Sequence, residues 1–288
     1  MKEHESVIFS KDHKFLEGLR WHDGHLWASD FFTKSVKRLA SDGSSFETIA
    51  EIAGAPSGLG FLDDGSILVV SQADATIRRL TTGGSDSLYA DFSSYAGGIG
   101  NDMIVTNSGH AYVGNFGFAL GAEDPRPTHL VHVDPTGIVE SVGGDVLFPN
   151  GMAITPDSVL LLAETWNHRI TAFDIVDDGS LANQRVWAQL DESLHPDDIA
   201  LDTDGGVWFG NALTLAEDSG FYRVIEGGEI TDKVPVPGAW AVSCTFGGNS
   251  LDTLYMSCNT TTLDEFHEGH SSARITTANV GRRGAPSV

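Results

Sequence analysis

The segment Phe148–Asp157, with the sequence FPNGMAITPD, decides the fold because versions of it recur along the chain. In each copy one residue at a fixed place begins an apolar run, and most copies continue through a turn containing Gly or Asp into a second apolar run. The fixed residues are Glu17, Ser57, Asn101, Asn150, Asp197 and Ala241, at intervals of 40, 44, 49, 47 and 44 residues. A period of about 40–50 residues built from short strands is typical of a β-propeller with one repeat per blade. The sequence therefore predicts an all-β, six-bladed β-propeller with a central channel.

The repeats account for nearly all of the 288 residues, so we expect a single β-propeller domain over residues 1–288. Residues 5–9 precede the first repeat and are expected to pair with the last blade, which removes an exposed sheet edge. The residues after Asn279, about nine in number, have no periodicity and are expected to form a frayed tail. A longer insertion, Gly117 to Thr128, interrupts the third repeat next to Asn101. Because long loops in compact domains are often functional, we expect this insertion to cover the channel mouth.

Acidic residues dominate the charge of the chain, with 40 Asp and Glu against 17 Lys and Arg and a net charge of −23. Such a charge repels phosphate backbones and anionic lipid surfaces, so neither nucleic acid nor a membrane is an expected partner. The N-terminus has no apolar leader, and no stretch approaches the roughly 18 consecutive apolar residues of a membrane helix. We therefore expect a cytoplasmic protein, a monomer or small homo-oligomer, whose partner is a small-molecule substrate.

Oxygen-bearing side chains occupy four of the six fixed positions, namely Glu17, Asn101, Asn150 and Asp197. Taken singly, Asn150 is also typical of a turn, and Glu17 of an exposed strand end. Because each fixed residue begins the innermost strand of its blade, ring closure should bring the four together at one mouth of the channel. Two carboxylates and two amides give an oxygen-only site of charge −2. Such a site suits Ca²⁺, Mg²⁺ or Mn²⁺ and lacks the Cys or His expected for Zn²⁺.

Several segments share a further pattern: LEGLRW (Leu16–Trp21), GNDM (Gly100–Met103), FPNGMA (Phe148–Ala153), PDDIALD (Pro196–Asp202), GGVW (Gly205–Trp208) and CTFGG (Cys244–Gly248). Through them the chain resembles the SMP-30/gluconolactonase family, also called regucalcin-like, over nearly all of its length. The resemblance implies a six-bladed propeller that binds one divalent cation, Ca²⁺ before Mg²⁺ or Mn²⁺, through Glu17, Asn150 and Asp197. It also implies that Asn101 lies beside the metal and holds the ligand or substrate.

The sequence departs from the family pattern at two positions. Asp198 stands where the family generally has Gly after the Asp, and it adds a carboxylate whose direction the sequence does not predict. Ile99 stands where sugar-lactone members tend to carry an Arg two residues before the Asn. Because Ile99 offers no hydrogen bond to a polyhydroxylated substrate, an aldonolactone is a less suitable substrate than a more apolar lactone.

The predicted function is a metal-dependent hydrolase that opens lactones or similar cyclic esters with a partly apolar substrate. Asp197 is the expected acceptor for the proton of the attacking water, and Asn101 is expected to orient the substrate. An apolar wall is expected around the metal, from side chains that would equally suit core packing: Ile99, Phe116, Phe118, Trp166 and Trp240. His267 and His270 fall in a predicted polar loop and are not expected to bind metal.

Two other functions use the same sequence features. The same metal site suits phosphoester hydrolysis or a lyase or hydratase step, which the sequence hardly separates from lactone opening. A non-catalytic propeller that binds a ligand is the alternative from another class, because one scaffold carries many functions. That alternative explains the repeat but not the four coincident oxygen donors.

Overall fold

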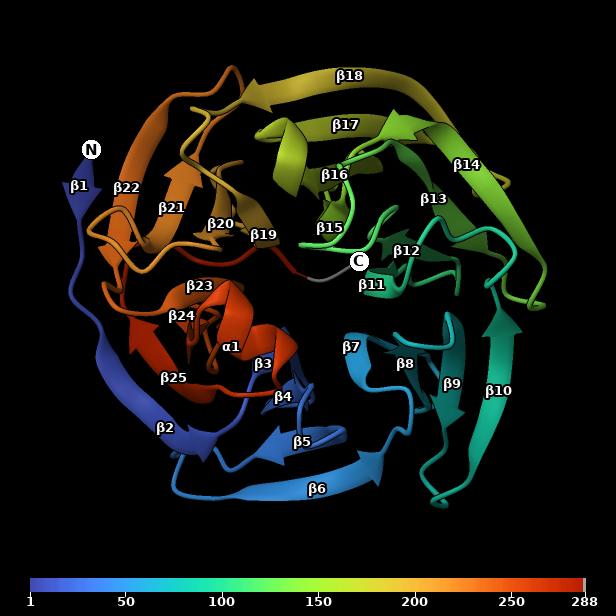
Figure 1. The fold of residues 1–288 in the computed structure, drawn as a ribbon, viewed down its shortest axis with the longest axis horizontal. Coiled ribbons are helices and arrows are strands. Elements are labelled where there is room, and N and C mark those ends of the chain that lie inside the picture. Colours follow the sequence, from blue (N-terminus) through green and yellow to red (C-terminus); the bar gives the residue numbers. More distant parts are fainter. Residues whose placement is uncertain (287–288) are drawn as a thin grey trace.

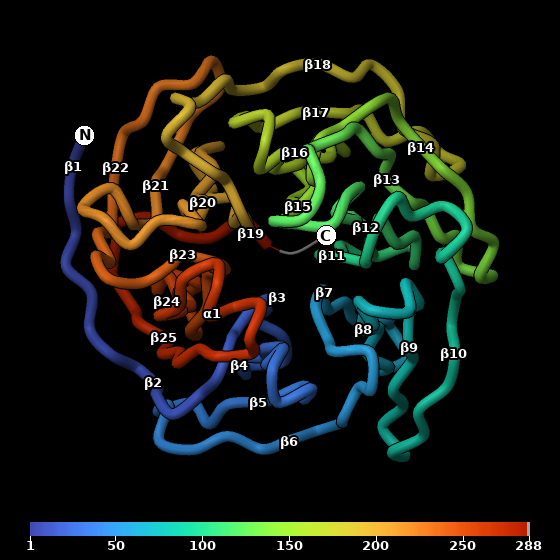
Figure 2. Tube along the Cα trace, viewed as in Figure 1, coloured from blue at the N-terminus to red at the C-terminus, as the bar shows by residue number. Residues whose placement is uncertain are grey.

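Six sheets stand around a central axis in the computed structural model, which describes residues 1–286 (Figure 1). In the Cα trace the chain passes once around this axis from blade one to blade six (Figure 2). The predicted all-β, six-bladed β-propeller is confirmed. Within each blade the innermost strand comes first in the sequence, so the six strands that line the channel are β3, β7, β11, β15, β19 and β23.

The first three blades are four-stranded antiparallel sheets. Blade one contains β3 (Leu16–His22), β4 (His25–Asp30), β5 (Ser35–Leu39) and β6 (Phe46–Glu51). Blade two contains β7 (Pro56–Phe61), β8 (Ile67–Ser71), β9 (Thr76–Leu80) and β10 (Asp86–Asp91). Blade three contains β11 (Gly100–Val105), β12 (Ala111–Asn115), β13 (Thr128–Val133) and β14 (Val139–Val146).

The last three blades follow the same plan, with N-terminal strands added to two of them. Blade four contains β15 (Pro149–Ile154), β16 (Val159–Glu164), β17 (Arg169–Ile175) and β18 (Leu181–Gln189). Blade five contains β19 (Pro196–Leu201), β20 (Val207–Asn211), β21 (Gly220–Val224), β22 (Ile230–Pro235) and the short β1 (Lys2–Glu3). Blade six contains β23 (Trp240–Gly247), β24 (Thr253–Thr260), β25 (Ser272–Ala278) and β2 (Val7–His13).

The hairpin between β3 and β4 shows how local sequence builds a blade. Its two-residue turn, Asp23-Gly24, has φ values of 48° and 73°. A type I′ turn needs positive φ at both central residues, and Asp-Gly adopts this conformation readily. His22 and His25 are paired at the two ends of the turn.

Each pair of neighbouring blades encloses an apolar cluster. Between blades five and six, Trp208 and Phe221 pack with Cys244 and Met256, and all four are at most 1% exposed. Equivalent clusters fill the other five junctions. The apolar residues are therefore used between blades, and the starts of the inner strands are left to carry polar side chains into the channel.

The N-terminus closes the ring. β2 pairs antiparallel with β25 of blade six, with Val7 opposite Thr277, and β1 pairs parallel with β22 of blade five. The predicted pairing of the N-terminal strand with the last blade is confirmed, although the strand runs over Val7–His13 and not over residues 5–9. This strand covers the edge that β25 would otherwise expose.

The residues after Asn279 cross the end of the channel opposite to α1. Gly284 bridges to Asp202, the Ala285 amide donates to the Leu201 carbonyl at 2.9 Å, and the Gly284 amide donates to the Leu251 carbonyl at 2.7 Å. The prediction of a frayed tail is therefore wrong for residues 280–286. Backbone hydrogen bonds hold this segment in place, and such bonds require no apolar periodicity in the sequence. Ser287 and Val288 lie outside the described residues.

Two short helical segments occur among residues 1–286: η1 (Thr165–Asn167) and α1 (Leu263–His267). α1 begins with a capping box, in which the Thr262 side chain accepts from the Glu265 amide and the Glu265 side chain accepts from the Thr262 amide. The predicted polar loop is therefore wrong for this segment, and the Thr-x-x-Glu pattern was the signal for the helix. Neither segment is long and apolar enough to cross a membrane.

A β-bulge interrupts every inner strand near its start. In β11, Gly100 pairs with Asn115 and Met103 pairs with Val113, so the register shifts by one residue across Asn101-Asp102. The other five inner strands show the same shift, which falls one residue later in blades one and six. Bulges re-aim side chains that a regular strand would send to opposite faces. This local irregularity determines which side chains reach the channel.

Candidate functional site

The starts of the inner strands enclose a cavity of about 60 Å³ at one end of the channel. Its lining includes the four predicted oxygen donors: Glu17 of β3, Asn101 of β11, Asn150 of β15 and Asp197 of β19. Of the two remaining fixed residues, Ser57 does not line the cavity, and in blade six Val242 lines it in place of Ala241. Ring closure therefore assembles oxygen-bearing side chains from blades one, three, four and five at one place.

Hydrogen bonds fix the two amide side chains, directly to the next blade for Asn101 and through Thr165 of its own blade for Asn150. The Nδ2 atom of Asn101 donates to the Pro149 carbonyl at 3.1 Å. The Nδ2 atom of Asn150 lies 3.2 Å from the Oγ1 atom of Thr165, which donates to the Pro196 carbonyl at 2.8 Å. With the amide N–H groups bonded to the wall, the carbonyl oxygens of both side chains are left to meet a ligand.

The two carboxylates provide the negative charge of the cavity. Burial raises the pKa of Glu17 well above its ordinary value, and the charge of Asp197 adds to the rise. Burial likewise raises the pKa of Asp197, with further contributions from the charges of Asp198 and Asp102. No Lys, Arg or His within residues 1–286 lines the cavity. A divalent cation here would oppose both causes of the raised pKa values.

The donor set fits a hard divalent cation. Among the described residues no group of three or more His, Cys, Asp or Glu is placed to hold a metal ion, so a cation in this cavity depends on the amide oxygens as well. Carboxylate and amide oxygens are the ligands that Ca²⁺ prefers and that Mg²⁺ and Mn²⁺ also accept. Gln72 adds a further polar group, with its Nε2 atom 3.4 Å from Oε1 of Glu17.

The predicted apolar wall is present only in part. Phe116 and Trp240 line the cavity, whereas Ile99, Phe118 and Trp166 do not. Ile99 is 37% exposed on the surface. Phe118 and Trp166 pack as a second layer around the ring of Phe148, whose centroid lies 5.6 Å and 6.5 Å from theirs.

All six blades contribute to the remaining lining. The residues that the sequence interpretation missed are Phe15, Phe31, Gln72, Leu120, Phe148, Thr165, Ala212, Leu213, Val242 and Phe266. Phe148 was within reach of sequence reasoning because it directly precedes Pro149-Asn150. Phe15 and Val242 are also close to fixed residues. Another repeat position lies directly after the second strand of a blade, 14 or 15 residues after the fixed residue, and it supplies Phe31, Gln72, Thr165 and Ala212. Leu120, Leu213 and Phe266 come from connections that have no repeat pattern.

Two connections cover this end of the channel. α1 places Phe266 over the cavity, where its ring meets those of Phe15 and Phe31 at centroid distances of 5.1 Å and 5.8 Å. The insertion in blade three contributes Leu120. Gly121 packs so closely against the His267 ring that a Cβ atom there would overlap it. The expectation that this insertion reaches the channel mouth is confirmed, and α1 meets it there.

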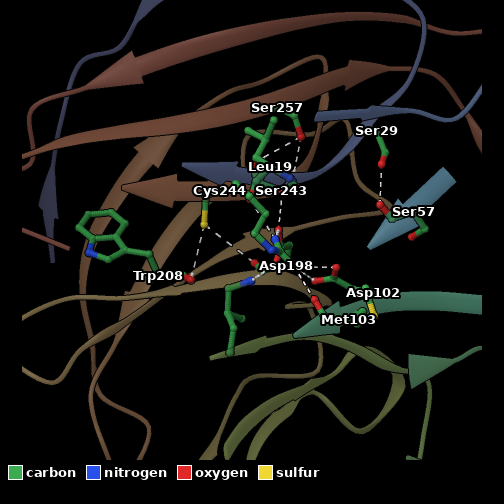
Figure 3. A network of polar contacts seen from close by, with 12 residues as sticks. Leu19, Ser29, Ser57, Asp102, Met103, Asp198, Trp208, Ser243, Cys244 and Ser257 are labelled. Carbon is green, nitrogen blue, oxygen red and sulfur yellow. Dashed lines mark hydrogen bonds and ion pairs between the residues drawn. The ribbon is translucent and has the colours of Figure 1, made fainter. Parts of the chain in front are cut away.

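A layer of ion pairs lies beneath the cavity. Arg20 donates through Nη2 to both carboxylate oxygens of Asp102, at 2.7 Å and 2.8 Å, and through Nη1 to Oδ2 of Asp198 at 3.0 Å. Ser243 of β23 also donates to Oδ2 of Asp198. Figure 3 shows Asp198 between Asp102 and Ser243 in this network. The carboxylate of Asp198, whose direction the sequence left open, therefore points into an ion pair and not into the cavity.

A second chamber, of about 450 Å³, opens on the other side of this layer. Arg20 forms part of its lining together with Trp21, and the tail residues Ala285 and Pro286 line its far end. The donors of the small cavity are absent from this lining. The ion-pair layer thus divides the channel, and the donor cavity faces the end covered by α1.

The fold and site define a class of protein: a six-bladed propeller with an oxygen-donor site at one end of its channel. The chain belongs to the SMP-30/gluconolactonase/LRE-like family, whose model matches residues 15–260. The resemblance seen in the sequence motifs is therefore confirmed at the level of the family.

Individual relatives are more distant. The chain is 27% identical over 142 residues to 6-deoxy-6-sulfogluconolactonase of Pseudomonas putida, covering 46% of each chain. It is 24% identical over 172 residues to regucalcin of Bos taurus, covering 57% of this chain and 56% of regucalcin. The match thus spans about half the length of these relatives. The structure of a calcium-binding regucalcin from Agrobacterium tumefaciens superposes with a TM-score of 0.78 at 17% identity, over 100% of this chain and 99% of the other. At that identity the likeness shows the fold alone.

Proposed function

We propose that the protein is a cation-dependent hydrolase that opens lactones or similar cyclic esters. The observation that carries this proposal is the convergence of oxygen donors from four blades in one cavity whose remaining lining is mostly apolar. Membership of the family and a relative named as a lactonase support the reaction class. The oxygen-only donor set supports a hard cation, with Ca²⁺ as the first choice.

The residues of the cavity have distinct roles in this reaction. A divalent cation held by Glu17, Asn150 and Asp197 would act as a Lewis acid that stabilises negative charge on the lactone carbonyl oxygen. Asp197 accepts a proton from water as the water oxygen bonds to the carbonyl carbon. The ring C–O bond then breaks, and the proton passes from Asp197 to the departing ring oxygen, which yields a hydroxy acid. Asn101, fixed through its N–H group to the wall, orients the substrate.

The wall selects an uncharged substrate with apolar substituents. Phe15, Phe116 and Trp240 present aromatic surface, and no basic side chain of residues 1–286 lines the cavity. The proposed cation would only balance the charges of Glu17 and Asp197, so a sulfonate or phosphate on the substrate would be buried without a basic side chain from the described residues to pair with. We therefore propose that this chain does not share the anionic substrate named for its Pseudomonas putida relative.

The two connections that cover the cavity, α1 and the blade-three insertion, must move for such a substrate to bind. Ligand pockets are typically about 300–1,000 Å³, whereas this cavity holds about 60 Å³. Phe266 of α1 and Leu120 of the blade-three insertion are the side chains at the cover. Their displacement would enlarge the cavity without disturbing the blades.

One equivalent of a hard divalent cation is expected to bind to the metal-free protein. The measurement is calorimetric titration with CaCl₂ and MnCl₂, followed by metal analysis after gel filtration. Glu17→Gln should weaken binding because it lowers the charge of the donor set from −2 to −1. Glu47→Gln, at a residue whose side chain is 62% exposed, is the matched control. No binding of either cation, or tight zinc binding through histidines, would contradict this expectation.

Neutral alkyl or aryl lactones are expected to have higher kcat/KM values than gluconolactone or a sulfonated lactone. Trp240→Ala should lower kcat/KM for an aryl lactone by about 10- to 100-fold, because it removes most of the burial of one large apolar group. Trp21→Ala, in the second chamber, is the matched control. A preference for gluconolactone would show that the assigned wall is wrong.

The substrate panel also separates the other uses of the donor set. A phosphotriester, an aryl ester and a substrate for a lyase or hydratase step belong beside the lactones, each with and without added CaCl₂. Turnover confined to one of these would replace lactone opening by that reaction. Cation binding without turnover of any of them would favour a ligand-binding propeller.

A further inference from the structure

We propose that Arg20 is a positioning residue for the cation donors, acting through Asp102 and Asp198; this rests on the cation site of the proposed function. Arg20, Asp102 and Asp198 are named here the Arg20 clamp. Its guanidinium holds Asp102 of β11 through Nη2 and Asp198 of β19 through Nη1. One side chain of blade one thereby ties together the inner strands of blades three and five.

The two acids held by the clamp directly follow two of the cavity donors in the sequence. Asp102 is next to Asn101, and Asp198 is next to Asp197. Both pairs of residues lie at the bulges of their strands, where the ladder pairing is interrupted. Ladder hydrogen bonds that would otherwise fix these two positions are missing there. The clamp supplies an alternative restraint at the place where each donor leaves its strand.

Contacts from the other blades leave the clamp little freedom. Ser243 accepts from the Leu19 amide at 2.8 Å and donates to Asp198, which joins β3, β23 and β19 (Figure 3). Gly58 of β7 packs against Asp102, and Gly151 of β15 packs against Asp198, so closely that a Cβ atom at either glycine would overlap its neighbour. All six inner strands therefore meet at this layer.

Asp102 and Asp198 are buried, and the Arg20 side chain is 19% exposed, on the side of the second chamber. Arg20 does not line the donor cavity, and its hydrogen bonds go to Leu19, Asp102, Met103 and Asp198 and to no predicted donor. Its effect on the cavity must therefore pass through the backbone of residues 101–102 and 197–198. Residues that orient metal ligands from outside the ligand set typically change metal affinity by about 10- to 100-fold when replaced.

A charge-only role and a positioning role of Arg20 predict opposite effects of Arg20→Met on cation affinity. If Arg20 acted only as a positive charge near the site, Arg20→Met would remove repulsion and tighten cation binding. If Arg20 positions the donors, Arg20→Met weakens cation binding, because Asp102 and Asp198 are left facing each other and β11 and β19 lose their link. Arg20→Lys keeps the charge but does not reproduce the bidentate fork of the guanidinium. The positioning role predicts weakening in this variant too, whereas the charge-only role predicts no change.

The experiment is calorimetric titration of CaCl₂ into metal-free native protein, Arg20→Met, Arg20→Lys and the control Arg223→Met. Arg223 forms an ion pair with Asp202 at 2.6 Å and is 4% exposed. Arg223→Met therefore also removes a buried arginine–carboxylate pair and lowers stability, but Arg223 lines neither the donor cavity nor the second chamber. We expect Kd for Ca²⁺ to rise about 10- to 100-fold in both Arg20 variants and to stay within about threefold of native in Arg223→Met, whose effect lies outside the site.

Each outcome decides the proposal. Unchanged or tighter Ca²⁺ binding in Arg20→Met, or equal weakening in Arg223→Met, overturns the clamp. If Arg20→Met does not fold, Arg20→Lys decides in the same way, since the charge-only role predicts native affinity for it. Native protein that binds Ca²⁺ but turns over no lactone refutes the proposed reaction and leaves the clamp standing. Native protein that binds no cation overturns both.

Discussion

Replacing Asp197 with Asn is expected to lower kcat for lactone opening by about 10²–10⁴-fold, the usual cost of removing a general base. The amide keeps the size of the side chain and one carbonyl oxygen, but it cannot accept the proton of the attacking water. The charge of the donor set falls from −2 to −1, so assays need saturating CaCl₂. The melting temperature should change little, because Asp197 opens β19 at the cavity and lies outside the apolar clusters between blades.

The matched control is Asp178→Asn, in the exposed turn between β17 and β18, which should keep native kcat. Activity above about a tenth of native in Asp197→Asn, where base removal should cost at least ~10², would exclude Asp197 as the base. The role would then pass to Glu17, the other carboxylate in the cavity. Asp198 is not the alternative, because Arg20 and Ser243 hold its carboxylate in the layer beneath.

Replacing Asp202 with Ala is expected to destabilise the fold by about 3–5 kcal/mol and to leave kcat nearly unchanged. Asp202 is buried and accepts hydrogen bonds from Arg223, Trp208 and two backbone amides of its own turn. The substitution leaves the guanidinium of Arg223 buried without its partner, and breaking a buried pair on one side typically costs that much. A fall in melting temperature of roughly 6–20 °C should follow.

Differential scanning calorimetry at saturating CaCl₂ measures this effect, with Asp178→Ala as the exposed control. A loss of about 1 kcal/mol lowers the melting temperature by about 2–4 °C. A fall in melting temperature of less than about 2 °C would therefore show that the Asp202 network contributes little to stability. A large loss of kcat in folded Asp202→Ala would instead connect this residue to the site. Asp197 and Asp202 lie near opposite ends of the same inner strand, so the two substitutions together separate the chemistry of the channel from the stability of the blade.

Most of the fold could be predicted from the sequence because each blade of a propeller repeats the same local sequence pattern. Alternating apolar residues and an Asp-Gly turn, as at Asp23-Gly24, are enough to specify a hairpin. The number of copies of the Phe148–Asp157 pattern gives the number of blades. The four oxygen donors could be brought together on the same basis. Their repeat position fixes where they lie around the axis, whatever the details of the loops. Their binding of a cation and their roles in catalysis remain predictions.

The tertiary structure alone decided what surrounds those donors. The cavity wall combines Leu120, Leu213 and Phe266 from connections in different blades, and contacts so distant in sequence leave no periodic pattern. Ile99 directly precedes β11 and Phe118 follows β12 in the insertion, yet neither lines the cavity. Ile99 is exposed at the surface, and Phe118 packs against Phe148.

The direction of Asp198 has the same explanation. A regular strand would send Asp197 and Asp198 to opposite faces, but both lie at a bulge, where alternation no longer predicts side-chain direction. Only the packed ring places Arg20 of blade one where it can hold Asp198 of blade five. The sequence by itself thus determined the number of blades and the four oxygen-bearing residues at the channel mouth. The packing of blades against one another decided which of the neighbouring carboxylates faces the cavity and which is held in an ion pair.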